Sequence, residues 1–153
     1  MRRSILIATL GAAILASSAQ GAVLGPRSAN SEALSLRWGR GLAVVGARGA
    51  ILGTLRRGRL VVTIPKGSTA VATVYGAEYK KKLSARRTLY RGYGLRYHVF
   101  HGRWRVRIVG RGVNASAAGE GWFGLDGTRG QYAVGGGAYK RWPSVYRTFS
   151  LGG

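Results

Sequence analysis

The residue types that support catalysis are scarce in this sequence. It contains two histidines, four acidic residues and no cysteine. A hydrolytic nucleophile needs a base and a third group that orients the base, and no motif of that kind surrounds any of the serines. The lack of cysteine also excludes disulfides, thiolate metal ligands and cysteine nucleophiles. The composition therefore predicts a protein with no catalytic residues and no cofactor.

Two spacings nevertheless invite a chemical interpretation. His98 and His101 are spaced like a metal-binding pair, but arginines surround them and would repel a cation, and no carboxylate or thiolate nearby completes the set. Glu120 and Asp126 could form the carboxylate pair of a glycosidase. Glu120, however, lies between two glycines and Asp126 precedes a glycine, as residues in turns do. We predict no metal site, and turn positions for both acids.

Positive charge is the dominant feature of the chain. It holds 25 lysines and arginines, 20 of them arginine, and its formal net charge is +21. With four acids in the whole chain, most arginines have no internal carboxylate to pair with. Such a field attracts polyanions, so the favoured partners are anionic wall polymers, anionic lipid surfaces and nucleic acids. Composition does not choose among these three partners.

One stretch of the chain concentrates this charge on a single face of a predicted sheet. From Leu95 to Ile108 apolar and basic residues alternate, and a two-residue turn at His101-Gly102 would pair Val99 with Trp104. The other face of this hairpin is the predicted anion-binding site, and it consists of Arg96, His98, Arg103, Arg105 and Arg107. Like charges opposite one another destabilise a sheet, and a bound polyanion would offset that effect. The alternative is a solvated basic face without a ligand.

The same alternation extends in both directions and predicts two three-stranded antiparallel meanders. Arg-Gly pairs recur at intervals that suit hairpin turns, at 40-41, 48-49, 57-58, 91-92, 111-112 and 129-130. A turn at 111-112 would place Ala115 opposite Ile108. Turns at 48-49 and 57-58 would give one face that is wholly apolar or glycine, made of Leu42, Val44, Gly46, Ile51, Gly53, Leu55, Leu60, Val62 and Ile64.

Shorter strands are expected on either side of the second meander. They are predicted at 69–75, 122–125, 131–134 and 145–151, with a turn at Asp126-Gly127. The stretch 78–87 breaks the alternation and is expected to be a loop or one helical turn. Because a sheet with one apolar face must cover it, the predicted fold class is all-β. The antiparallel meanders would pack as a small β-sandwich or close as a barrel, preceded by a signal-peptide helix.

The N-terminal segment predicts export. The pair Arg2-Arg3 precedes an apolar run at 5–15 and then a series of small residues, which are the three parts of a secretory signal. We therefore divide the chain into a signal peptide at 1–21, a flexible leader at 22–33 and a single β domain at 34–153. The expected location is the cell envelope or the extracellular space. The alternative is a signal that stays uncleaved as a membrane anchor.

The run from Tyr90 to Tyr97, together with that from Gly102 to Gly112, resembles exported Gly/Arg-rich β proteins of high-GC bacteria that have no known activity. The similarity covers about residues 42–151 and implies export and β structure only. The features together predict a non-enzymatic envelope protein that binds anionic polymers through an arginine-rich sheet face. One alternative is a structural module that self-assembles into a homo-oligomer through its sheet edges. Another is a hydrolase of an envelope polymer.

Overall fold

The computed structural model describes residues 33–152, which form one antiparallel β-sheet of seven strands. The predicted all-β class is confirmed, while the predicted signal peptide and nearly all of the leader lie outside the described residues. Three strands form most of the sheet, namely β1 (Ala33–Thr63), β4 (Arg87–Phe100) and β5 (Arg103–Val134). The short strands are β2 (Val71–Tyr75), β3 (Tyr79–Ser84), β6 (Lys140–Arg141) and β7 (Arg147–Leu151). No helix among the described residues could span a membrane.

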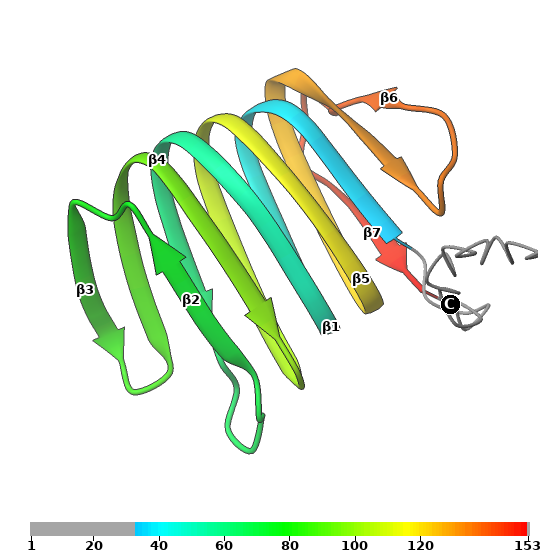
Figure 1. Ribbon diagram of the computed structural model, residues 1–153. Coiled ribbons are helices and arrows are strands. Elements are labelled where there is room, and N and C mark those ends of the chain that lie inside the picture. The colour runs from blue at the N-terminus through cyan, green and yellow to red at the C-terminus, as the bar shows by residue number, and fades with distance from the viewer. Residues whose placement is uncertain (1–32, 153) are drawn as a thin grey trace, which may run out of the picture.

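The long strands wind around a common axis, and each turn of the winding pairs with the next (Figure 1). Ala43 in β1 pairs with Ile108 on one side and with Leu125 on the other, and these two residues of β5 lie 17 positions apart. Ile108 in turn pairs with both Ala43 and Leu60, which are also 17 positions apart in β1. One turn of this coil therefore corresponds to the interval from Ala43 to Leu60, and the second turn of each strand extends the sheet begun by the first.

The winding flattens the sheet into two layers that face each other across the core. The strands bend where they pass from one layer to the other (Figure 1). One series of these bends includes a row of paired glycines. Gly58 shows why glycine is needed there, since its φ is +152° and a Cβ atom would collide with the carbonyl oxygen of Val109 on the next strand. In spatial order, the glycine row consists of Gly92, Gly58, Gly110, Gly41 and Gly127. The sheet is not closed into a barrel, so that predicted alternative is wrong.

The core lies between the two layers and is apolar. No polar or charged residue among those described is buried. The core-facing positions predicted within 95–108 and at 115 are confirmed, and Trp104 is buried with its indole Nε1 donating to the Gly49 carbonyl oxygen at 3.0 Å. The largest fully buried side chains come from both layers and include Phe123, Leu34, Leu36, Ile51, Leu55, Leu60, Leu95, Ile108 and Leu125.

The predicted hairpin at His101-Gly102 is wrong. Val99 pairs with Ile51 of β1 and not with Trp104, because the chain bends at His101-Gly102 and continues as β5 in the opposite layer. Both arrangements bury the same alternate residues, so the alternation is correct while the predicted partners are not. The same holds for Ala115, which pairs with β1 and not with Ile108.

The other predicted turns in the meanders are also wrong. The Arg-Gly pairs and Asp126-Gly127 lie inside continuous strands, where glycine lets the strand bend without ending. Since β1 runs through 48-49 without a turn, its first half contributes Ala43, Val45 and Ala47 to the core cluster and not the predicted Leu42, Val44 and Gly46, although Val44 is also buried. The stretch 78–87, predicted to be a loop or a helical turn, contains β3, which pairs with β4.

Candidate anion-binding site

Four arginines lie side by side across four neighbouring segments of the sheet. The register pairs Arg129 with Arg40, Arg40 with Arg111, and Arg111 with Arg57, and all four side chains are exposed. We call these four residues the arginine row. Because neighbouring strands are about 4.8 Å apart, the row is a ladder of positive charge with a step of roughly that length. At its end, Arg57 pairs with Tyr93 and holds its guanidinium carbon 4.9 Å from the centre of that ring.

The coil explains how these arginines come together. Arg40 and Arg57 both precede a glycine of the glycine row, and they are 17 positions apart, which is one turn. One turn of β1 therefore brings them to the same bend, with a single segment of β5 between them. Arg111 is in that segment and follows Gly110. The arginine row thus runs beside the glycine row, because both follow from the positions at which the strands bend.

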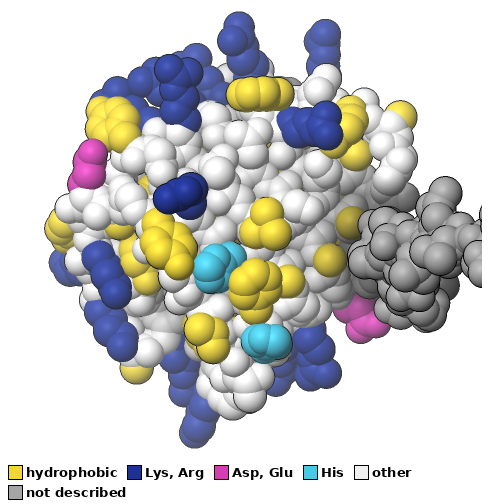
Figure 2. All heavy atoms as spheres, viewed as in Figure 1, with side chains coloured by type: hydrophobic (Ala, Val, Ile, Leu, Met, Phe, Trp, Pro, Cys, Tyr) yellow, Lys and Arg dark blue, Asp and Glu magenta, His cyan; other side chains and the backbone are white. Residues whose placement is uncertain are grey.

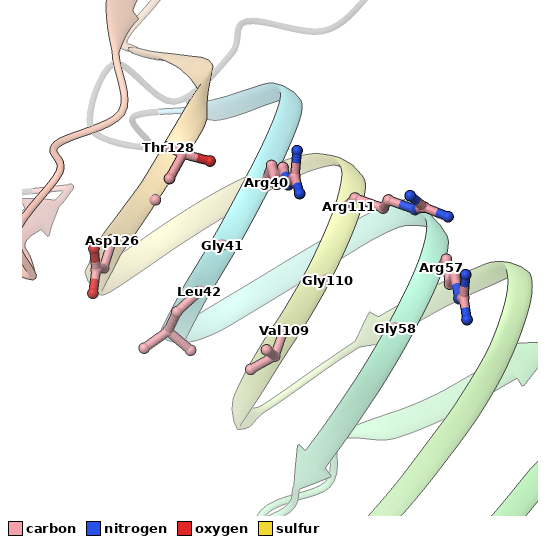
Figure 3. Close-up of a pocket in the computed structure, with 11 residues that line it drawn as sticks. Arg40, Gly41, Leu42, Arg57, Gly58, Val109, Gly110, Arg111, Asp126 and Thr128 are labelled. Carbon is pink, nitrogen blue, oxygen red and sulfur yellow. The ribbon is translucent and has the colours of Figure 1, made fainter.

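Four members of the glycine row, Gly58, Gly110, Gly41 and Gly127, form the floor of an open groove of about 720 Å³ (Figure 3). Arg40, Arg111 and Arg57 project from successive ribbons along one margin of this groove, while Leu42 and Val109 project on the other. With no side chains on the floor, the backbone is open to a ligand that lies across the strands. The groove can therefore accommodate an extended chain whose charges meet successive arginines.

A second hollow, of about 490 Å³, lies on the other side of the arginine row. Arg40, Arg111 and Arg129 line it together with Arg56 and Arg96, and no acidic residue contributes to the lining. Five guanidinium groups thus surround one concave surface. Guanidinium groups are hydrogen-bond donors only, so this hollow suits a ligand that carries several acceptor oxygens and negative charge.

Trp38 also lines the second hollow and is unusually exposed. Its side chain is 72% accessible, and its backbone has φ of +54°, a left-handed conformation that is uncommon for a bulky residue. Asn114 holds this conformation, because its Oδ1 accepts a hydrogen bond from the Trp38 backbone N–H at 3.0 Å. The Asn114 amide nitrogen donates to the Gly112 carbonyl oxygen at 3.3 Å and to Thr54 Oγ1 at 3.4 Å. The fold therefore fixes the backbone of an exposed tryptophan at the margin of the arginine row.

The positive charge of this surface is not balanced by the protein. Residues 33–152 contain 17 arginines and 5 lysines but three acids, Glu78, Glu120 and Asp126. Asp126 is the acid that lines the groove, opposite the arginine margin. Glu120 and Asp126 lie within β5 and not in turns, six positions apart, which in an extended strand is ~20 Å. That separation exceeds the range of a glycosidase pair.

The structure separates the predicted anion-binding residues into two groups. Arg96 and His98 lie in the layer that contains the end of β4, and Arg96 lines the second hollow. His98 stacks on Phe100 with ring centres 4.9 Å apart. Arg103, Arg105 and Arg107 lie in the other layer, where they pair with β1 and not with Arg96 or His98. All of them except the half-buried His98 are exposed, but they do not form one continuous face.

The layer with Arg96 and His98 is the one that faces the viewer in Figure 2. Lysine and arginine side chains gather mainly around its margins, while the two histidines and several hydrophobic side chains lie nearer the centre. Tyr75, His98 and Phe100 form part of this central patch, with Arg96 over the Tyr75 ring at 6.0 Å. No group of three or more His, Asp or Glu side chains that could hold a metal ion lies within residues 33–152.

The predictions from the sequence do not include the arginine row or Trp38. They place Arg57 and Arg111 in hairpin turns of two separate meanders, where they would not be neighbours. The pattern that indicates the coil is the nearly equal spacing of two sets of Arg-Gly pairs, from 40-41 to 57-58 and from 111-112 to 129-130. No known protein family, curated protein or solved structure matches this chain.

Proposed function

We propose that this protein is an exported, non-enzymatic protein of the cell envelope that binds anionic polymers along the arginine row. The observation that carries the proposal is the direct pairing of Arg40 with Arg111 and of Arg111 with Arg57. Like charges opposite each other destabilise a sheet, and a polyanion lying along the row would convert this repulsion into attraction. Export rests on the predicted signal peptide.

The length of the row favours a polymer over a single small anion. Three strand steps of about 4.8 Å separate its first and last members, which gives a span of ~14 Å. One phosphate or carboxylate would contact one or two arginines, whereas a chain of linked anions would contact all four. The open groove beside the row extends in the same direction and leaves room for such a chain.

Arg96 belongs to the same surface, because it lines the second hollow with three members of the row. His98 lies next to Arg96, on the side away from the row. We propose that Arg103, Arg105 and Arg107 contribute to the general positive field but not to the site itself. They therefore provide a matched control, since they are exposed arginines of the same sheet but lie in the layer opposite to that of Arg96.

The test is the binding of the full-length chain to polyphosphate, anionic liposomes, wall polymers and DNA across a series of salt concentrations. The variant R40Q/R57Q/R111Q should bind the preferred polymer at least ten-fold more weakly at low salt, with a shallower dependence of log affinity on log salt. The variant R103Q/R105Q/R107Q removes the same charge and should lose much less affinity. Equal losses in the two variants, or no binding by the wild type at low salt, would overturn the proposal.

The self-assembly alternative meets a physical obstacle at one edge of the sheet. Strand β3 pairs with β4 alone, and its exposed residues include Lys80, Lys81 and Lys82. Lysines on an edge strand disfavour pairing with a second copy of the chain. Sedimentation of the full-length chain across a concentration series separates the two functions, because self-assembly depends on concentration and polymer binding depends on salt.

A further inference from the structure

Trp38 is the most exposed of the large hydrophobic residues described, and a hydrogen bond to Asn114 holds its backbone. A left-handed backbone costs a non-glycine residue about 1–2 kcal/mol, and residues kept in such conformations cluster at functional sites. The hydrogen bond to Asn114 acts on the backbone of Trp38 and leaves the indole free. The exposed aromatic surface is therefore a feature that the neighbouring residues maintain.

The lining of the second hollow limits what can lie against this indole. Five arginines offer donors, and the Asn114 amide is already engaged with Trp38, Gly112 and Thr54. A sugar presents hydroxyl groups that each need an acceptor as well as a donor, and no carboxylate of the described residues lines the hollow. The hollow is better matched to a ligand that combines a flat aromatic ring with phosphate oxygens.

A second aromatic side chain lies at the far end of the row. Tyr93 is 55% exposed and pairs with Arg57, whereas Trp38 lies two positions before Arg40 in β1. The segments that carry these two aromatics are separated by three strand steps, or ~14 Å. Trp38 lies on the segment of Arg40 and Tyr93 lies beyond Arg57, so Arg111 and Arg57 come between the two rings in the order of the sheet. Proteins bind single-stranded nucleic acid with this combination of groups, because bases stack on aromatic rings and phosphates meet the cations.

We infer that the anionic polymer bound at the arginine row is single-stranded nucleic acid, with a base stacked on Trp38. This inference rests on the proposed function, and it specifies the class of polymer. A single strand can place a base against the indole at little cost, because its bases are not paired. A duplex would first have to unpair and unstack a base. Polyphosphate and anionic lipid surfaces carry charge but have no base, so they could use only the arginines.

The experiment compares ligands that differ only in their bases. Fluorescence anisotropy would measure the affinity of the full-length chain for a dT15 oligonucleotide and for an abasic 15-mer with the same phosphate backbone. The wild type should bind dT15 about ten-fold more tightly than the abasic strand. Trp38→Ala should lose that preference, so that the ratio of its two affinities falls to about one. Trp38→Phe should keep most of the preference, since it retains an aromatic ring.

The outcomes separate this inference from the proposed function. If neither strand binds at low salt and no other polyanion does, both are wrong. If dT15 and the abasic strand bind equally, or if the preference survives in Trp38→Ala, the proposed function stands and the inference is overturned. It is likewise overturned if polygalacturonate, an anionic glycan, binds the wild type more tightly than dT15 and loses affinity in Trp38→Ala. Circular dichroism of each variant confirms that the sheet is intact.

Discussion

Arg111 lies directly opposite Arg57 on the neighbouring segment of the sheet, and on its other side it lies opposite Arg40. Arg111, one of the two inner members of the arginine row, thus has a like charge on both sides. Proteins keep unfavourable local arrangements at functional sites, where ligand binding offsets them. The stability of the free protein and its affinity for polyanions should therefore respond in opposite directions to substitutions in the row.

Replacing Arg111 with glutamine should stabilise the free protein by about 0.5 kcal/mol at low salt, because it removes two like-charge pairs across strands. The same substitution should weaken polyanion binding. Urea unfolding without ligand measures the stability, and the gain should shrink in 1 M salt, where charges are screened beyond ~3 Å. The control is Arg107→Gln in the same strand, since the partners of Arg107 are Val44 and Val61. A stability gain of the same size in Arg107→Gln would mean that net charge, and not the row, is responsible.

Replacing Trp38 with glycine should stabilise the free protein by about 1 kcal/mol, because glycine adopts positive φ without strain. Trp38→Ala keeps the strain and should show no such gain. Urea unfolding of the two variants at the same salt concentration makes the comparison. If Trp38→Gly proved no more stable than Trp38→Ala, the backbone at this position would not be strained. If both variants proved less stable than the wild type, the indole would contribute packing energy, and its exposed position would need no functional explanation.

The glycine row should tolerate no side chain. Gly58→Ala should destabilise the protein by about 2–4 kcal/mol, because it adds both a strained φ and a collision with the Val109 carbonyl oxygen on the next strand. Gly67→Ala is the matched control, since Gly67 also has positive φ, +75°, but has open space where the Cβ would be. Its cost should be about 1 kcal/mol. Thermal unfolding of the two variants would show whether the bend depends on close approach of the strands. Equal losses of stability in the two variants would argue against that dependence.

Tyr97 has the one buried side-chain polar atom in the described structure that lacks a hydrogen-bond partner, its phenolic oxygen. Tyr97→Phe should therefore be at least as stable as the wild type at neutral pH, because it removes an unsatisfied polar group. Burial also raises the pKa of Tyr97 above its ordinary value near 10. The unfolded chain then releases the Tyr97 proton at a lower pH than the folded chain does, so stability is lost as pH rises above 10.

The advantage of Tyr97→Phe should consequently widen by up to ~1.4 kcal/mol for each pH unit above 10. Urea unfolding of both proteins at pH 7 and pH 11 would measure this difference. All other ionisable groups are common to the two proteins, so their contributions cancel in the comparison. A constant difference between pH 7 and pH 11 would contradict the raised pKa.

The sequence by itself determined the all-β class, the excess of positive charge and most of the residues that face the core. Alternation along a strand has a period of two whatever the neighbouring strand is. For that reason Leu95, Val99, Trp104 and Ile108 are buried as predicted although their strand partners are not those expected. The exposure of the arginines could also be predicted from the sequence, because the chain has too few acids to pair with so many cations.

Only the tertiary structure decided which strands are neighbours. The strand neighbours in turn determine which residues form the candidate site. Arg40 and Arg57 both meet Arg111 because the interval between them matches one turn of the coil, and the length of a turn depends on how both layers close over the core. A glycine in a strand is locally compatible with a turn that ends the strand or a bend that continues it. The choice is made by packing between segments distant in the chain, so local pattern alone could not reveal the arginine row or the exposed Trp38.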